Sequence, residues 1–310
     1  MPITSLPPVR GFLKKHSGAS QTGRRIAAFD CDGTIIRGDI GEAMLYRQID
    51  RFFFRRSPAE IWKDYPRRET LHALYTSLAT TPEEERPTSE AFDQFAKLVL
   101  DWYFDQINDG AVAKACTDIV RLFSGFSADE VRRFAEETFL EAHALTLGRR
   151  TLGGRSLPAG IRYIRESVEL IEALKAEGFE VWAISGSNKW SVEPVLARLG
   201  VPKERVIGIE LTEVGGLCTA QEINPVPIRE RKVEALRKRI PHPPLLSASD
   251  SKNDIPLLLY ASELRVRINS RGRDTADFFR TVGTTPDDSW VLVEHLTLVN
   301  EGDPLWPMLQ

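Results

Sequence analysis

The sequence predicts an α/β fold: a doubly wound, Rossmann-like parallel sheet with an inserted helical domain. Short apolar runs of strand length alternate with segments of helical periodicity over residues 164–269. This alternation is typical of a parallel sheet covered by helices on both faces. Residues 40–160 differ, because they show helical periodicity with few strand signals. We therefore assign them to a separate helical domain.

The expected elements of the sheet region follow one another in a regular order. The strands are expected at residues 25–29, 179–184, 205–211, 245–249 and 264–269, and the helices at residues 164–176, 190–199 and 230–240. Gly178 and Gly200 stand where two of these helices should end. The sequence Val214-Gly215-Gly216-Leu217 is typical of a hairpin turn.

The helical domain interrupts the sheet region directly after its first strand and the following turn. Its clearest helical periodicity lies in residues 90–104 and 128–145. The sheet-containing core is accordingly expected at residues 25–39 and 161–310. The prolines, glycines and basic residues of segment 1–24 predict a flexible N-terminal tail.

Composition and charge exclude several classes of function. The 310 residues carry a formal net charge of −3, which gives no broad electrostatic footprint for nucleic acid. We find no apolar run of membrane-span length and no secretory signal. The three cysteines form no disulfide framework, which favours a reducing, cytoplasmic location. We expect Cys31 to be a small buried residue rather than a catalytic thiol.

Polar side chains stand at the carboxyl ends of several expected strands. Asp30 and Asp32 follow the first strand, Ser185 follows the second, and Asp250 follows the strand at residues 245–249. Ligands of open α/β sheets bind beyond the carboxyl ends of the strands. We therefore expect these four side chains to converge on one site.

These residue types favour chemistry on a phosphate. The aspartates can bind Mg²⁺, a hard cation that prefers oxygen ligands. The Ser185 hydroxyl and the backbone N–H groups near Gly186 can cradle a phosphate, and Lys232 can add a positive charge. Each feature alone has a structural alternative, namely a solvated Asp turn, a helix-capping serine or a surface lysine. Their occurrence together, in this order and at strand ends, favours a functional site over these structural alternatives.

Four motifs in this order resemble those of the haloacid dehalogenase-like superfamily of phosphatases. They are Asp30-Cys31-Asp32-Gly33-Thr34, then Ser185, then Lys232, then Asp250-Ser251-Lys252-Asn253-Asp254. The resemblance extends over about residues 25–270. It implies that Asp30 is the nucleophile and becomes phosphorylated, and that Asp32 is the general acid and base.

The same resemblance implies a metal site. Mg²⁺ would be held by the side chains of Asp30 and Asp250 and by the main-chain carbonyl of Asp32. Asp254 would orient this set of ligands. The implied cofactor is therefore Mg²⁺ alone.

The resemblance also implies a phosphate site. Ser185 and Lys232 would bind the phosphate, with backbone support from Gly186. The Thr34 hydroxyl and the Gly33 backbone would support the first loop. The implied partner is a small phosphomonoester, with no nucleic acid and no membrane.

The long insert resembles the helical cap of the phosphoserine phosphatase-like branch. Within that branch the chain is similar to bacterial phosphorylcholine phosphatases, on the evidence of residues 25–30, 122–127 and 289–293. This implies a substrate with an amino or ammonium group. Those enzymes are exported, whereas this sequence shows no signal segment, and the four-residue spacing of its last motif is like that of phosphoserine phosphatase.

Four residues are candidates for substrate recognition. Asp39 stands nine positions after Asp30, where the branch has an acidic residue that meets the substrate's amino group. It can equally be the N-cap of the next helix. Trp102 and Tyr103 can contact a cationic head group or simply pack the core of the cap. Asn253, within the last motif, is a further candidate.

We therefore expect a Mg²⁺-dependent phosphomonoesterase that acts through an aspartyl-phosphate. Two alternatives stay open. One is a phosphotransferase that passes the phosphoryl group to an acceptor other than water. The other is a metabolite-binding protein without turnover, although a pure binder has no evident need for Asp32.

Overall fold

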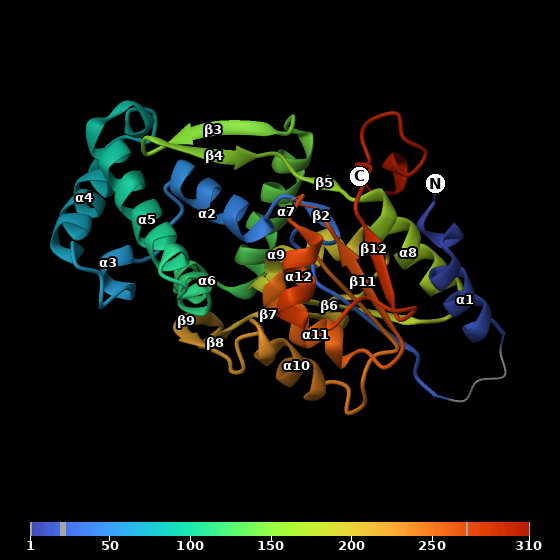
Figure 1. The fold of residues 1–310 in the computed structure, drawn as a ribbon. Coiled ribbons are helices and arrows are strands. Elements are labelled where there is room, and N and C mark those ends of the chain that lie inside the picture. The colour runs from blue at the N-terminus through green and yellow to red at the C-terminus, as the bar shows by residue number, and fades with distance from the viewer. Residues whose placement is uncertain (1, 19–22, 271, 310) are drawn as a thin grey trace.

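A six-stranded sheet forms the centre of the core domain, and a helical cap projects from one end of it (Figure 1). The structure is a computed structural model that describes residues 2–18, 23–270 and 272–309. The strand order is β12-β11-β10-β1-β6-β7. All neighbouring pairs are parallel, which confirms the predicted fold class.

Five of the six strands lie where the apolar runs predict them, and one was missed. The strands are β1 (Ile26–Phe29), β6 (Glu180–Asn188), β7 (Val206–Ile209), β10 (Leu246–Ser249), β11 (Leu264–Ile268) and β12 (Trp290–Val293). The missed strand is β12. It lies at the edge of the sheet, beside β11, beyond the last strand that the sequence predicts.

Helices cover both faces of the sheet. On one face α8 (Arg165–Ala176) and α9 (Lys189–Ala197) pack in the same hydrophobic cluster as Ala27 and Phe29 of β1. On the other face α10 (Glu230–Arg237) and α11 (Ile255–Tyr260) pack with Ile26 and Ala28. Successive side chains of a strand point to opposite faces. The four residues of β1 are therefore all buried, and this explains the continuous apolar run.

The cap is an α-helical domain with a hydrophobic cluster of its own. Its helices are α2 (Ile40–Asp50), α3 (Pro58–Ile61), α4 (Arg68–Thr80), α5 (Glu90–Asn108), α6 (Val112–Arg121) and α7 (Ala128–Ala144). The range 40–160 also contains a hairpin that we did not expect, formed by β3 (Gly148–Leu152) and β4 (Arg155–Ala159). Gly153 and Gly154 turn it with positive φ angles of 52° and 73°, which glycine adopts readily.

Two ribbons lie where the core meets the cap. The strand β2 (Ile36–Arg37), which leads into the cap, pairs with β5 (Arg162–Tyr163), which leads out of it. The expected hairpin turn at residues 214–217 is confirmed, since it joins β8 (Leu211–Val214) to β9 (Leu217–Glu222). Glu222 of this hairpin forms an ion pair of 2.7 Å with Arg121 of the cap.

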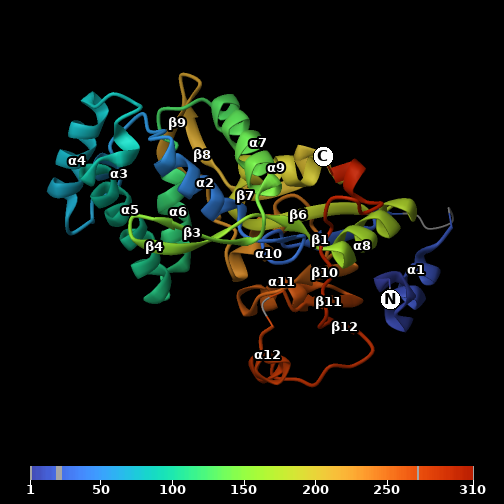
Figure 2. The same ribbon diagram turned by 90° about the horizontal axis from the view of Figure 1, so that it is seen from above.

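The N-terminal segment differs from the expected loose tail. Residues 7–16 form α1 (Pro7–His16), which lies at the opposite end of the molecule from the cap (Figure 2). Two prolines suit the first turn of a helix, because their missing N–H groups would have no partner there. Val9 and Phe12 are buried, and the Phe12 ring lies 5.6 Å from that of Phe179. This packing holds the segment on the core.

The remaining elements are short. They are α12 (Thr275–Val282) and the 3₁₀ helices η1 (Ile3–Ser5), η2 (Arg86–Thr88), η3 (Lys203–Arg205), η4 (Lys252–Asp254) and η5 (Trp306–Leu309). Across the described residues, we find no helix that combines the length and the apolar character needed to cross a bilayer.

Adjacent leucines of α11 should differ sharply in their contribution to stability. Leu258 is 0% exposed and Leu259 is 46% exposed. We expect Leu258→Ala to lower the free energy of unfolding by about 2–5 kcal/mol, because it leaves a cavity. Leu259→Ala should change it by less than about 1 kcal/mol. Urea denaturation of both variants measures the difference, and equal losses would contradict the packing described here.

Candidate active site

The first motif places Asp30 directly after β1, where the strand ends. The Asp30 carboxylate is buried, and its Oδ1 accepts a hydrogen bond of 2.7 Å from Lys232 Nζ. Its Oδ2 accepts one of 3.1 Å from the Thr34 hydroxyl. The same hydroxyl oxygen accepts a hydrogen bond of 3.0 Å from the backbone N–H of Asp250. Thr34 therefore links the loops that follow β1 and β10.

Lys232 joins two of the buried carboxylates. Its Nζ lies 2.7 Å from Asp30 Oδ1 and 2.7 Å from Asp254 Oδ1. Burial alone would lower the pKa of this lysine, but the charges of Asp254 and Asp30 raise it above its ordinary value. The ammonium group therefore stays charged at neutral pH.

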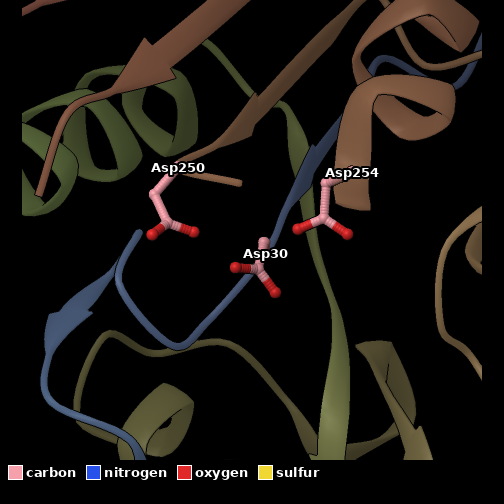
Figure 3. A group of neighbouring side chains, drawn as sticks. All are labelled: Asp30, Asp250 and Asp254. Atoms are coloured by element: carbon pink, nitrogen blue, oxygen red, sulfur yellow. The ribbon is translucent and has the colours of Figure 1, made fainter. Parts of the chain in front are cut away.

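Three buried carboxylates form a cluster suited to a hard cation. Asp30, Asp250 and Asp254 each offer an oxygen, and these atoms all lie within 4.8 Å of one another. In Figure 3 the carboxylates of Asp250 and Asp254 lie on either side of Asp30. Ligands that are only oxygen fit Mg²⁺. The three carboxylates, from the first and the fourth motif, therefore fit the implied metal.

Asp254 has both of its oxygens engaged by the protein. Oδ1 accepts from Lys232, and Oδ2 accepts a hydrogen bond of 2.7 Å from the Ser249 hydroxyl. The Asp250 carboxylate accepts a hydrogen bond of 3.2 Å at Oδ2 from the Ser270 hydroxyl.

The close approach of two loops requires glycine at position 33. Gly33 has a φ of +80°, and a Cβ atom there would lie 2.5 Å from Asp250 Oδ2. Any side chain would push this carboxylate away. The glycine of the first motif therefore makes room for the aspartate of the fourth.

The concentration of negative charge shifts the protonation of Asp30. Burial raises its pKa, the Lys232 charge lowers it, and the charges of Asp254 and Asp250 raise it again, to about 8 in all. In the absence of a metal, the Asp30 carboxyl group therefore binds a proton more readily than an ordinary aspartate does. A divalent cation would favour the ionised form.

Asp32 is held by three hydrogen-bond donors. Its Oδ1 accepts from the backbone N–H of Ile40 at 2.8 Å, and its Oδ2 accepts from the hydroxyls of Ser185 at 3.1 Å and Ser187 at 2.7 Å. Burial and the nearby charge of Asp39 raise the pKa of Asp32 to about 7, although the three donors lower it. A carboxyl group with such a pKa can both give and take a proton near neutral pH. Ser187 was not among the residues that the sequence suggested.

A cavity of about 310 Å³ opens between this cluster and the cap. The residues of the core that line it include Asp30, Asp32, Gly186, Lys232 and Asp250. The cap contributes mainly apolar side chains from α2, α5 and α6. The carboxylates thus face a partly open cavity of the size of a small organic molecule.

Three of the four substrate candidates line this cavity. They are Asp39, Tyr103 and Asn253. Trp102 is not among the lining residues in the described part of the chain. Its ring Nε1 donates to Asp118 Oδ2 at 3.1 Å, and Lys114 Nζ lies 4.5 Å from the ring centroid. Its cation–π partner is therefore a lysine of the protein.

Asp39 is an N-cap residue and a lining residue at once. Its Oδ1 accepts a hydrogen bond of 2.9 Å from the backbone N–H of Glu42, at the start of α2. Glu42 also lines the cavity, and its carboxylate accepts from the hydroxyls of Tyr46 at 2.7 Å and Tyr103 at 3.4 Å. The sequence suggested Asp39 but only placed Glu42 in the first turn of the helix.

The cysteine between the two aspartates is not part of the site. Cys31 is fully buried in the cluster that contains α8 and α9. Burial, together with the charges of Asp32 and Asp30, raises the pKa of its thiol well above the ordinary value. The expectation of a small buried residue is confirmed.

Comparison with solved structures shows the same fold in uncharacterised proteins. A conserved, functionally unknown protein from Anaerococcus prevotii has 18% sequence identity and a TM-score of 0.69, over 87% of this chain and 86% of that chain. A protein of unknown function from Bordetella pertussis has 18% identity and a TM-score of 0.54, over 88% and 99% of the two chains. A substrate-bound phosphoserine phosphatase has 13% identity and a TM-score of 0.44, over 89% and 95%.

Sequence comparison identifies the family. No curated protein sequence matches the chain. The model of the family described as haloacid dehalogenase-like hydrolase matches residues 27–259, which include all four motifs and the whole cap. The protein belongs to the haloacid dehalogenase-like hydrolase family.

Proposed function

We propose that the protein is a Mg²⁺-dependent phosphomonoesterase that hydrolyses a small organic phosphate through a phosphorylated Asp30. The observation that carries this proposal is the position of Lys232. It bridges Asp30 and Asp254 at the floor of a cavity that a small phosphate ester can enter. In this proposal Asp30 is the nucleophile, Lys232 supplies the positive charge and Asp32 is the acid.

The proposed reaction has two steps on the chain's own residues. An Asp30 oxygen attacks phosphorus, the bond from phosphorus to the leaving oxygen breaks, and Asp32 gives its proton to that oxygen. Water then attacks the phosphorus, passes a proton to Asp32, and Asp30 leaves as a carboxylate. Lys232, Ser185 and the backbone near Gly186 would bind the phosphate oxygens.

The metal has a limited and specific place in this proposal. Asp30, Asp250 and the main-chain carbonyl of Asp32 would hold Mg²⁺, with Asp254 beside them. When bound, the ion would neutralise charge that develops on the phosphate. Lys232 contacts Asp30 and Asp254, and the charges of Asp254, Asp250 and Asp32 still raise the pKa of Asp30. A further positive charge would therefore relieve the repulsion among these carboxylates.

We further propose that the substrate carries an amino or ammonium group. Asp39 and Glu42 line the cavity on the side of the cap, and Tyr103 stands beside Glu42. Negative charge and an aromatic ring both favour a cation. Asn253 lines the opposite side of the cavity and is a further candidate for a polar contact.

Asp30→Asn should abolish turnover without unfolding the chain. The amide cannot attack phosphorus, so kcat should fall by at least about 10³-fold. The amide keeps the size of the side chain, so the melting temperature should stay close to that of the wild type. Phosphate release with Mg²⁺ measures the effect, with the exposed Asp288→Asn as the matched control. Retained metal-dependent turnover would refute the role of Asp30 as nucleophile.

Mg²⁺ binding should strengthen as the pH rises towards about 8, the pKa of Asp30 in the metal-free protein. Below this pH the ion must displace the proton that Asp30 holds, and above it there is no proton to displace. Mg²⁺ at about 100 times its Kd should raise the free energy of unfolding by about 2.7 kcal/mol. Calorimetric titration and thermal melts measure both effects. Asp250→Asn should remove most of the stabilisation, and binding that weakens with rising pH would contradict this site.

Asp39→Asn separates the two roles of this residue. Asparagine is as good an N-cap as aspartate, so the melting temperature should be unchanged. The charge is lost, so kcat/KM for phosphoethanolamine should fall about 10-fold more than kcat/KM for propyl phosphate, which lacks the ammonium group. An equal effect on both esters would show that Asp39 does not recognise an ammonium group.

A further inference from the structure

Ser187 makes the shortest side-chain contact to Asp32. Its hydroxyl donates to Asp32 Oδ2 at 2.7 Å, compared with 3.1 Å for the Ser185 hydroxyl. The backbone N–H of Ser187 donates to the Ser185 hydroxyl oxygen at 3.0 Å. The two serines therefore form a small network around a single carboxylate oxygen. Ser187 contributes two donors to it, its hydroxyl and its backbone N–H.

The other oxygen of Asp32 is fixed from the cap. Oδ1 accepts from the backbone N–H of Ile40, the first residue of α2. A backbone N–H can only donate a hydrogen bond, whereas a serine hydroxyl can turn and act as donor or acceptor. Ile40 and the two serines therefore hold the Asp32 carboxyl group at both of its oxygens.

Gly41 leaves just enough room for the Ser187 hydroxyl. A Cβ atom at position 41 would lie 2.7 Å from Ser187 Oγ and 3.3 Å from Ser187 Cβ. Gly41 lies within a helix, where alanine would otherwise be the better residue. The absence of a side chain at position 41 of α2 therefore leaves room for the Ser187 hydroxyl.

We propose that Ser187 is the positioning residue for Asp32, holding its carboxyl group in the orientation from which it protonates the leaving oxygen. This inference rests on the proposed function. In the step concerned, Asp30 forms a bond to phosphorus, the bond to the leaving oxygen breaks, and the Asp32 proton moves to that oxygen. The products are an alcohol, the Asp32 carboxylate and phosphorylated Asp30.

The test compares two esters that differ in their need for an acid. An alkyl phosphate such as propyl phosphate must be protonated as it leaves, because an alkoxide is a strong base. p-Nitrophenyl phosphate releases a weakly basic phenolate, which leaves without a proton. kcat/KM reports on steps up to the first phosphoryl transfer, so hydrolysis of phosphorylated Asp30 does not affect the comparison.

In Ser187→Ala, kcat/KM for propyl phosphate should fall about 10-fold, and kcat/KM for p-nitrophenyl phosphate should fall less than about 3-fold. The matched control is Ser191→Ala, which removes a buried hydroxyl from the start of α9, the helix that follows Ser187 in the chain. Ser191 donates to the Asn188 carbonyl at 2.6 Å and does not contact Asp32. Ser191→Ala should not lower kcat/KM for one ester more than kcat/KM for the other.

Gly41→Ala provides an independent second variant, because it displaces the Ser187 hydroxyl without removing it. It should reproduce the selective loss for propyl phosphate. In the double variant Gly41→Ala with Ser187→Ala, the loss should not exceed that of the single variants, since both act on one hydrogen bond. Thermal melts of each variant exclude loss of folding as the cause.

Each outcome decides the inference. A selective loss for propyl phosphate in both single variants supports it. Equal losses for the two esters, or no loss in either, overturn it, and they leave the proposed function intact because the wild type is active. If the wild type releases phosphate from neither ester, the proposed function fails and the inference fails with it.

Discussion

The site depends on one constraint: several carboxylates must lie together in a buried place. Lys232 meets this constraint in part, because it lies 2.7 Å from both Asp30 and Asp254. Hydroxyl and backbone donors compensate the remaining negative charge by hydrogen bonds. Burial of the carboxylates without these partners would be unfavourable. The high pKa of Asp30 indicates that the compensation is incomplete in the absence of a metal. The same imbalance makes the cluster favourable for a cation.

The parallel sheet brings these groups together. Asp30 follows β1, Asp250 follows β10, and Ser185 lies in β6. These three neighbouring strands all run in one direction, so their carboxyl ends meet at one edge. Thr34 then links the loop after β1 to the loop after β10. Because β1 and β10 are fully buried, the site stands on the buried centre of the sheet.

The cap contacts Asp32 as well as lining the cavity. It supplies most of the apolar wall of the cavity. Its first helix also donates the Ile40 N–H to Asp32. The orientation of Asp32 is thus tied to the position of α2, and Gly41 in the same helix faces the hydroxyl of Ser187. A displacement of α2 would alter the cavity and the Asp32 carboxylate together.

The sequence by itself determined the class of sheet, five of its strands and the core of the site, because apolar runs and the residues that end them are local signals. It did not reveal α1, the β3–β4 hairpin or β12, whose stability comes from packing on distant segments. Ser187 and Asp32, which form a hydrogen bond, are 155 residues apart in the sequence. The sequence also does not distinguish an aromatic residue that lines a cavity from one that packs elsewhere in the cap, as Trp102 does. Such contacts depend on where helices and loops meet in space, so only the tertiary structure decided them.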